Sequence, residues 1–207
     1  MKLSSNEEDY LKAVYGLGEW DPRPVTTGAI AARLGVAPAS ATTMVSKLAG
    51  RGLLEHPPYG AVTLTPEGRL AALGVVRRHR LLETFLVGEL GYRWDEVHEE
   101  AELLEHTVSR RFIDRLDERL GYPAADPHGD PIPAADGTLR LPDAVRLDQS
   151  DAGGSAVVVR VSDADPGFLR RCAEAGIVPG NTLDVAGHGF TGEQAAAIWV
   201  RPLSPAR

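Results

Sequence analysis

Cysteine is almost missing from this 207-residue chain, which contains only Cys172. A single thiol cannot form a disulfide within the chain. Long apolar segments are missing as well, since no run approaches the roughly 20 residues needed to span a bilayer. The first ten residues, MKLSSNEEDY, contain no apolar signal core. We therefore expect a cytoplasmic location and no membrane partner.

Positive charge is also scarce, because 22 Lys and Arg face 29 Asp and Glu and give a net charge of −7. Residues 1–70 carry seven basic and seven acidic side chains, residues 71–140 carry nine and fourteen, and residues 141–207 carry six and eight. Broad electrostatic attraction to nucleic acid is therefore excluded. Any DNA contact must depend on a few placed cations and on helix N-termini.

The first 70 residues nevertheless have the pattern of a winged helix-turn-helix. Two short helices are joined by a tight turn at Gly35, and the second begins at Pro38, a residue suited to a first helical position. A hairpin follows around residues 57–60 and forms the wing. The predicted segments are helices at about 6–19, 29–34 (capped by Thr26 or Thr27) and 38–50, and strands at 52–56 and 61–64. The alternative is a generic three-helix bundle with a hairpin.

The second short helix is rich in small polar residues, as a recognition helix in the major groove commonly is. Its N-terminal half would face base edges, and its two cations would contact phosphates. The expected DNA-contacting residues are Pro38, Ala39, Ser40, Thr42, Thr43, Lys47 and Arg51. The competing interpretation is that Ser40 and Thr42 merely cap or decorate the helix.

The middle of the chain is strongly helical, with one helix predicted at about 66–90 and another at about 94–120. Apolar residues on the first, including Leu73, Val76, Leu81 and Phe85, exceed what a small monomer needs. Since helix-turn-helix proteins usually read two-fold operators, we expect these residues to bury a homodimer interface.

The last third of the chain changes character after a loop rich in Pro, Gly and Asp at 122–142. Short β-type runs flank a brief helix at about 166–175. The runs, at 156–161, 182–185 and 197–200, indicate a small, partly open β-barrel.

Potential metal ligands lie on one face of the second middle helix. At about 100° per residue, His98, Glu102, Glu105 and His106 fall at roughly 0°, 40°, −20° and 80°. His79 and Glu83 add a second pair at i, i+4 spacing. Imidazoles and carboxylates without a thiolate favour manganese or iron over structural zinc. The alternative is a solvated, Glu-rich face with a surface ion pair.

Four segments, taken together and in this order, resemble the diphtheria-toxin-repressor family of metal-dependent regulators. They are EDYLKAVY at 8–15, RHRLLE at 78–83, VHEEAELLEH at 97–106 and PHGDPIP at 127–133. The resemblance covers nearly the whole chain. It implies a mainly α fold with small β parts: a winged helix-turn-helix domain at 1–70, a helical dimerisation and metal-binding domain at 71–140, and an SH3-like (FeoA-like) barrel at 141–207.

The resemblance also implies the activity and the sites. Bound metal promotes binding to operator double-stranded DNA by a homodimer, which represses metal-uptake genes. The regulatory metal site falls on Asp9, Glu102, Glu105 and His106. The second site falls on His79, Glu83 and His98, with Asp163 or Asp165 as an optional fourth ligand from the barrel.

Two positions assign the chain to the manganese-responsive branch. Iron-type members of the family carry Met where Asp9 stands and Cys where Glu102 stands. Oxygen and imidazole ligands suit Mn(II), with Fe(II) as the alternative and Zn(II) or Co(II) as substitutes in vitro. Lys12 departs from manganese members that place a Glu there to hold a second ion, which argues against a two-metal cluster of that kind.

Two other function classes compete with a metal-dependent repressor. Carboxylates and histidines on adjacent helices also build di-metal oxidases or hydrolases. Such enzymes favour a Glu-x-x-His motif on each of two helices. The segment that contains His79 and Glu83 does not have this motif. The second class is a regulator that senses an organic molecule in its β-barrel. In such a protein the potential metal ligands on the second middle helix would have no role. The prediction is therefore a repressor and not an enzyme.

Overall fold

The computed structural model describes residues 3–58, 60–150 and 154–203. Within it the chain divides into two compact units, one formed by residues 1–78 with 133–137 and the other by residues 79–132 with 138–207. Helix α4 (Pro66–Leu90) runs from the first unit into the second. No helix among the described residues is both long and apolar enough to cross a membrane.

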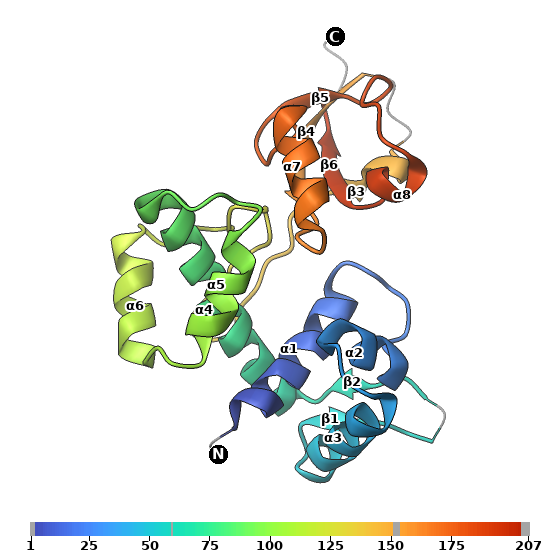
Figure 1. The fold of residues 1–207 in the computed structure, drawn as a ribbon, viewed down its shortest axis with the longest axis vertical. Coiled ribbons are helices and arrows are strands. Elements are labelled where there is room, and N and C mark those ends of the chain that lie inside the picture. Colours follow the sequence, from blue (N-terminus) through green and yellow to red (C-terminus); the bar gives the residue numbers. More distant parts are fainter. Residues whose placement is uncertain (1–2, 59, 151–153, 204–207) are drawn as a thin grey trace. The chain divides into compact units, whose positions relative to one another are not determined.

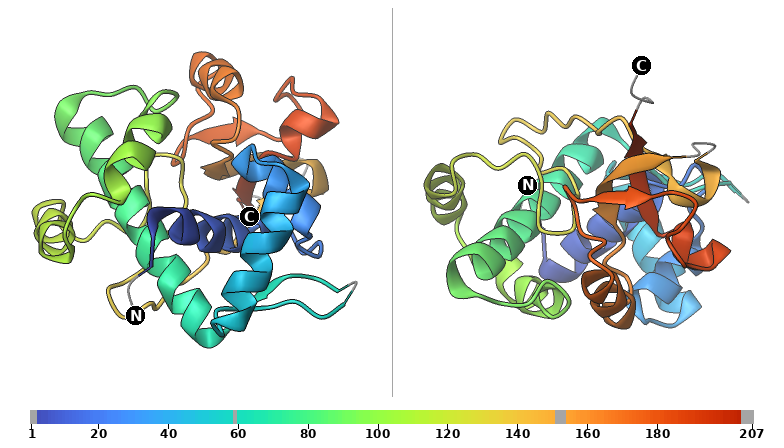
Figure 2. Two further views of the ribbon diagram at one scale, coloured as in Figure 1. Left: turned by 60° about the horizontal axis from the view of Figure 1, so that its bottom comes forward. Right: turned by 90° about the horizontal axis from the view of Figure 1, so that it is seen from above.

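The first unit contains three complete helices, a two-stranded hairpin and the first half of α4. Their arrangement can be followed in Figures 1 and 2. Each helix starts at a residue suited to that position: Ser4 and Glu7 form a capping box, the Thr26 side chain accepts from the Ala29 amide, and Pro38 opens the third. The elements are α1 (Ser5–Glu19), α2 (Thr27–Leu34), α3 (Pro38–Gly50), β1 (Leu54–Glu55) and β2 (Thr63–Leu64).

The turn between α2 and α3 depends on Gly35, whose φ of 64° lies in the left-handed region. Apolar side chains at helical spacing on α3, Ala41, Val45 and Leu48, are buried in the core of this unit. The predicted winged helix-turn-helix is therefore present, with a shorter hairpin than predicted. Tyr59, in the predicted turn, lies outside the described residues.

The second unit begins with the latter half of α4 and continues into α5 (Val97–Glu105) and α6 (Arg110–Arg119). The prediction of one helix over 94–120 is wrong. The α5 helix ends at Glu105, with His106 as its C-cap, and Ser109 caps a new helix by accepting a hydrogen bond from the Phe112 amide. The two helices pack with α4 around a core formed by Leu81, Leu82, Leu86, Val97, Ala101, Ile113 and Leu116.

The apolar residues of α4 that were expected to form a dimer interface are used inside the chain instead. Leu73, Val76 and Leu81 are buried, and Phe85 packs against the core of the second unit. Large apolar side chains that stay exposed on the helices of this unit include Leu90 at the end of α4 and residues of α5 and α6. Leu103 is 73% exposed and Phe112 is 47% exposed.

The C-terminal part of the second unit is a four-stranded antiparallel sheet. Its strands lie in the order β3 (Val145–Arg146), β6 (Ile198–Pro202), β4 (Ser155–Val161) and β5 (Thr182–Asp184). Its core is rich in Val, Leu, Ile and Ala, with Phe168 and Cys172 from α7. Burial raises the pKa of the Cys172 thiol to about 11. Helices α7 (Pro166–Glu174) and α8 (Gly192–Ala195) accompany the sheet. Strand β3 and helix α8 were not predicted.

Two buried arginines join the loop before this sheet to strand β4 and to helix α4. The Arg160 guanidinium of β4 donates to the Asp130 carboxylate over 2.6 Å, and Arg80 of α4 donates to the Pro131 carbonyl over 2.6 Å. Gly129 has a φ of 92°, and a Cβ there would lie 2.0 Å from the Val159 carbonyl oxygen. Only glycine permits this close approach of loop and strand.

Candidate metal centre

Three predicted ligands meet on adjacent helices of the second unit. His79 and Glu83 stack one turn apart on α4, and His98 projects from α5. The three distances are 3.0 Å from His79 Nε2 to Glu83 Oε1, 3.1 Å from His79 Nε2 to His98 Nδ1, and 3.2 Å from His98 Nδ1 to Glu83 Oε1. This spacing matches donor atoms that surround one ion at a metal–ligand distance of about 2.1 Å.

Hydrogen bonds alone cannot satisfy this triangle. Glu83 Oε1 only accepts, so if both facing ring nitrogens carry hydrogens, those hydrogens oppose each other. If only one ring nitrogen is protonated, the lone pair of the other faces the carboxylate lone pair. At most two of the three contacts are favourable, whereas a cation satisfies all three. The donor set therefore fits a divalent metal ion.

A fourth donor comes from the C-terminal part of the unit. The Asp163 Oδ2 atom lies 3.3 Å from His98 Nδ1. Asp165, the other residue considered for this role, instead caps α7 by accepting from the Gly167 amide over 2.8 Å. Of the two alternatives, the structure brings only Asp163 to the histidine.

The ionisation of the cluster reflects its charge balance. Burial alone would raise the pKa of Glu83, but His79 and His98 outweigh it and hold that pKa well below its ordinary value. Burial would lower the pKa of His98, but its contacts with Glu102, Glu83 and Asp163 raise that pKa to about 10. A proton on an imidazole thus balances the carboxylates, which is the charge that a bound cation would replace.

The predicted regulatory ligands on α5 lie near its C-terminus. Glu105, which is 1% exposed, is the last helical residue, and its Oε1 lies 3.4 Å from Nε2 of His106, the C-cap. Glu102 Oε1 lies 3.4 Å from His98 Nε2. Asp9 lies on α1 in the first unit, and its membership of this site stays a prediction.

Two further donors of this region were not assigned by the sequence analysis. His128 is fully buried and shares Glu83 as a neighbour, with 3.8 Å between its Nδ1 and Glu83 Oε2. Its Nε2 donates to the Trp94 carbonyl over 2.6 Å, so Nδ1 carries the lone pair when the ring is neutral. Nδ1 has no hydrogen-bond partner among the described residues. Donor atoms of Glu83, Asp126 and His128 all lie within 4.8 Å of one another.

Asp126 is held in this group by its own loop, because its carboxylate accepts from the amides of His128 and Asp130 over 2.8 and 3.0 Å. Burial and the nearby carboxylates of Asp130 and Glu83 raise the pKa of Asp126 to about 8. The sequence signals for this pair were the Asp-x-His spacing before Gly129 and the segment PHGDPIP at 127–133, and neither identified a metal ligand. Asp126 and His128 are distant from His79 in the sequence, so their position beside the metal ligands could not be recognised without the structure.

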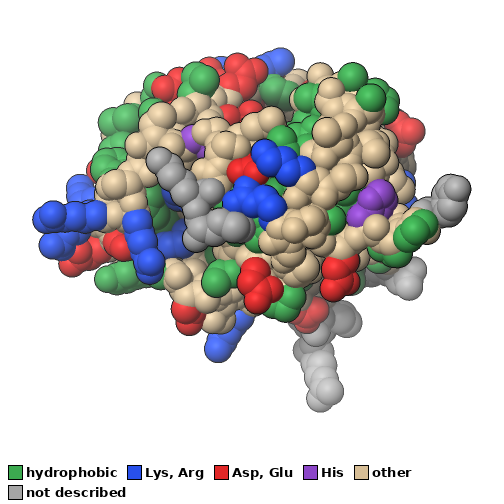
Figure 3. Space-filling view, turned by 90° about the horizontal axis from the view of Figure 1, so that it is seen from below, with side chains coloured by type: hydrophobic (Ala, Val, Ile, Leu, Met, Phe, Trp, Pro, Cys, Tyr) green, Lys and Arg blue, Asp and Glu red, His purple; other side chains and the backbone are tan. Residues whose placement is uncertain are grey.

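The predicted DNA-contacting residues lie on α3 and at its end, as expected. Thr42 and Thr43 donate from their hydroxyls to the carbonyls of Pro38 and Ala39 over 3.0 and 2.9 Å. Their oxygens then have lone pairs left for base amino groups. On the face drawn in Figure 3, basic, acidic and hydrophobic side chains are interspersed.

Comparisons with known proteins cover each part of the chain. Residues 2–62 match the family "Iron dependent repressor, N-terminal DNA binding domain". Residues 65–134 match "Iron dependent repressor, metal binding and dimerisation domain", and residues 145–197 match "FeoA domain".

Individual relatives agree with these matches. The iron-dependent repressor IdeR of Mycobacterium leprae (strain TN) is 36% identical over 199 residues, which is 88% of this chain and 84% of that protein. The diphtheria toxin repressor of Corynebacterium glutamicum is 34% identical over 155 residues, covering 75% and 66%. A solved manganese-dependent transcriptional repressor in complex with manganese is 46% identical and has a TM-score of 0.87, covering 95% and 100%.

Proposed function

The chain belongs to the diphtheria-toxin-repressor family of metal-dependent transcriptional repressors, and from this premise we propose that Mn(II) is the metal that activates it. The observation that carries the proposal is the triangle of His79, Glu83 and His98, which hydrogen bonds cannot fully satisfy. Oxygen and imidazole donors suit Mn(II) over softer metals. The manganese-bound relative supports the same choice over Fe(II).

Two sites would hold the metal. One consists of His79, Glu83 and His98, with Asp163 as a fourth ligand. The regulatory one consists of Asp9, Glu102, Glu105 and His106. A bound divalent ion would supply positive charge among these carboxylates. Asp9 would then tie α1, and with it the DNA-binding domain, to α5, so that the two recognition helices of a homodimer match the operator spacing.

On DNA, the start of α3 would read base edges through Pro38, Ala39, Ser40, Thr42 and Thr43. Lys47 and Arg51 would contact phosphates, which adds affinity but little sequence preference. The repressor would act in the cytoplasm on operators of metal-uptake genes.

The test is a selection from a random duplex library in the presence of Mn²⁺, followed by anisotropy titrations of the enriched sequence. Mn²⁺, Fe²⁺, Zn²⁺ and Co²⁺ are compared under anaerobic conditions. We expect micromolar Mn²⁺ to activate binding and His106→Ala to abolish the metal response while weak, salt-sensitive binding persists. Activation by Fe²⁺ alone, or full metal dependence in His106→Ala, would contradict the proposal.

A further inference from the structure

The two cations of the recognition region share one buried carboxylate. Glu7, on the first turn of α1, forms an ion pair with the Arg51 guanidinium, and its Oε1 lies 3.3 Å from the Lys47 ammonium. The Glu7 side chain is 5% exposed, while that of Lys47 is 57% exposed. The carboxylate therefore lies beneath a cation that solvent, or a ligand, can reach.

The Glu7 carboxylate is fixed in this position by the backbone. Its Oε2 accepts from the Ser4 amide over 2.9 Å, and the Ser4 hydroxyl accepts from the Glu7 amide over 3.3 Å. This capping box holds the side chain at the start of α1. Unlike a mobile surface glutamate, Glu7 cannot swing away from the cations without uncapping its own helix.

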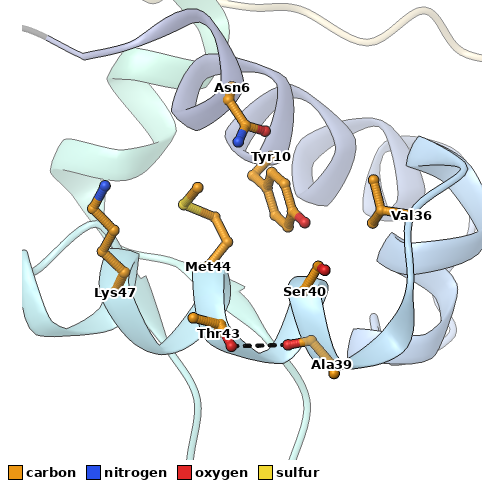
Figure 4. Close-up of a pocket in the computed structure, with 8 residues that line it drawn as sticks. All are labelled: Asn6, Tyr10, Val36, Ala39, Ser40, Thr43, Met44 and Lys47. Atoms are coloured by element: carbon orange, nitrogen blue, oxygen red, sulfur yellow. Dashed lines mark hydrogen bonds between the residues drawn. The ribbon is translucent and has the colours of Figure 1, made fainter.

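Lys47 matters because it is the only charged residue within α3. Figure 4 shows it extending from α3 toward the start of α1, at the rim of a hollow. Asn6 and Tyr10 of α1 line this hollow together with Ser40, Thr43 and Met44 of α3. The side chains expected at the DNA therefore share a surface with the first turns of α1.

We propose that Glu7 is a built-in competitor of DNA phosphate, which holds Lys47 and Arg51 and so keeps metal-free binding to DNA weak. The inference rests on the proposed function, since it takes α3 as the DNA-binding helix. A phosphate approaching Lys47 meets a cation whose charge is already balanced and a carboxylate that repels it. The device is local to the first unit, and each of its residues belongs to α1 or to α3 and its C-cap.

The experiment compares Glu7→Gln with wild type on mixed-sequence duplex DNA in a chelator, over a range of salt concentrations. Glutamine preserves the capping box but removes the charge. We expect the slope of log K against log salt to steepen by about 0.9, and the affinity near 0.15 M salt to rise about fivefold, because one more phosphate is neutralised.

The matched control is Glu8→Gln, which makes the same change in net charge on the same helix. Glu8 pairs with Arg78 of α4 over 2.7 Å. We expect it to change the slope by much less. Lys47→Met should remove more of the slope in the Glu7→Gln background than in wild type, because only there is the ammonium released from the carboxylate.

An unchanged or reduced affinity in folded Glu7→Gln would overturn the inference and would mean that Glu7 organises the cations for DNA. If circular dichroism shows that Glu7→Gln is unfolded, Glu7→Asp replaces it. The shorter carboxylate withdraws from the cations, so the affinity should rise by less than fivefold, and no rise would overturn the inference. If wild type binds no duplex DNA with or without Mn²⁺, it is the proposed function that fails.

Discussion

His79 donates a hydrogen bond from Nδ1 to Oε2 of Glu105 over 2.6 Å, across 26 positions of the chain. This contact joins the two predicted metal sites, because His79 belongs to one and Glu105 to the other. The donation leaves the lone pair of a neutral His79 on Nε2, the atom that faces Glu83 and His98. A carboxylate that orients a metal-binding imidazole in this way commonly strengthens the site.

The first prediction follows from this contact. Glu105→Gln should weaken metal binding at both sites, and at the His79 site by about 10- to 100-fold, because the imidazole loses its charged partner. His106→Ala should weaken only the regulatory site. Calorimetric titration with Mn²⁺ distinguishes the two variants, and Glu99→Gln, on an exposed position of α5, is the control. A normal His79 site in Glu105→Gln would show that the sites are independent.

The second prediction concerns metal selectivity. Glu102→Cys adds a thiolate to the regulatory site and should shift activation from Mn²⁺ toward Fe²⁺ or Zn²⁺, because soft ligands favour those metals. Glu102 is half-exposed, so the smaller side chain should be accommodated. The measurement is metal-dependent binding to the selected operator. Glu102→Gln, which lacks sulfur, should weaken activation without changing the order of metals, and a matching shift in both variants would contradict the argument.

The third prediction concerns the homodimer. Exposed apolar residues on α5 and α6 replace those of α4 as the expected contact surface. Leu103→Asp and Phe112→Asp should each weaken self-association of the metal-free protein by about tenfold or more, since a buried carboxylate lacks a partner. Sedimentation velocity measures the effect. Leu141→Asp changes a leucine that is 54% exposed and lies outside these helices, and it should leave the dimer intact.

The fourth prediction tests the loop that carries Asp126 and His128. Gly129→Ala should lower the free energy of unfolding by about 3 kcal/mol, because the left-handed backbone is strained and the new Cβ meets the Val159 carbonyl. Gly91→Ala has a similar positive φ of 73° but open space around it, and should cost about 1 kcal/mol. Urea denaturation compares the two, and equal losses would show that the close approach to β4 is unimportant.

Local patterns were enough to predict most of the helices and the family. The signals at the start of α2 and α3, the glycine turn and the ends of α4 act over a few residues. Thr26, one of the two caps considered, does cap α2, Pro38 is the first residue of α3, and the turn and the bounds of α4 are confirmed. The break between α5 and α6 was missed because the hydrophobic periodicity continues across it. The capping serine, Ser109, is a local signal that could have revealed it.

Ligand residues one helical turn apart could be recognised from the sequence, because 3.6-residue periodicity places His79 over Glu83 and His98 beside Glu102. What only the tertiary structure decided was which separate segments meet. It brings Asp163 to His98 and His128 toward Glu83, places Glu105 behind His79, and sets Glu7 against the recognition-helix cations. These contacts join residues distant in the chain through the packing of several elements, and periodicity within one element carries no information about that packing.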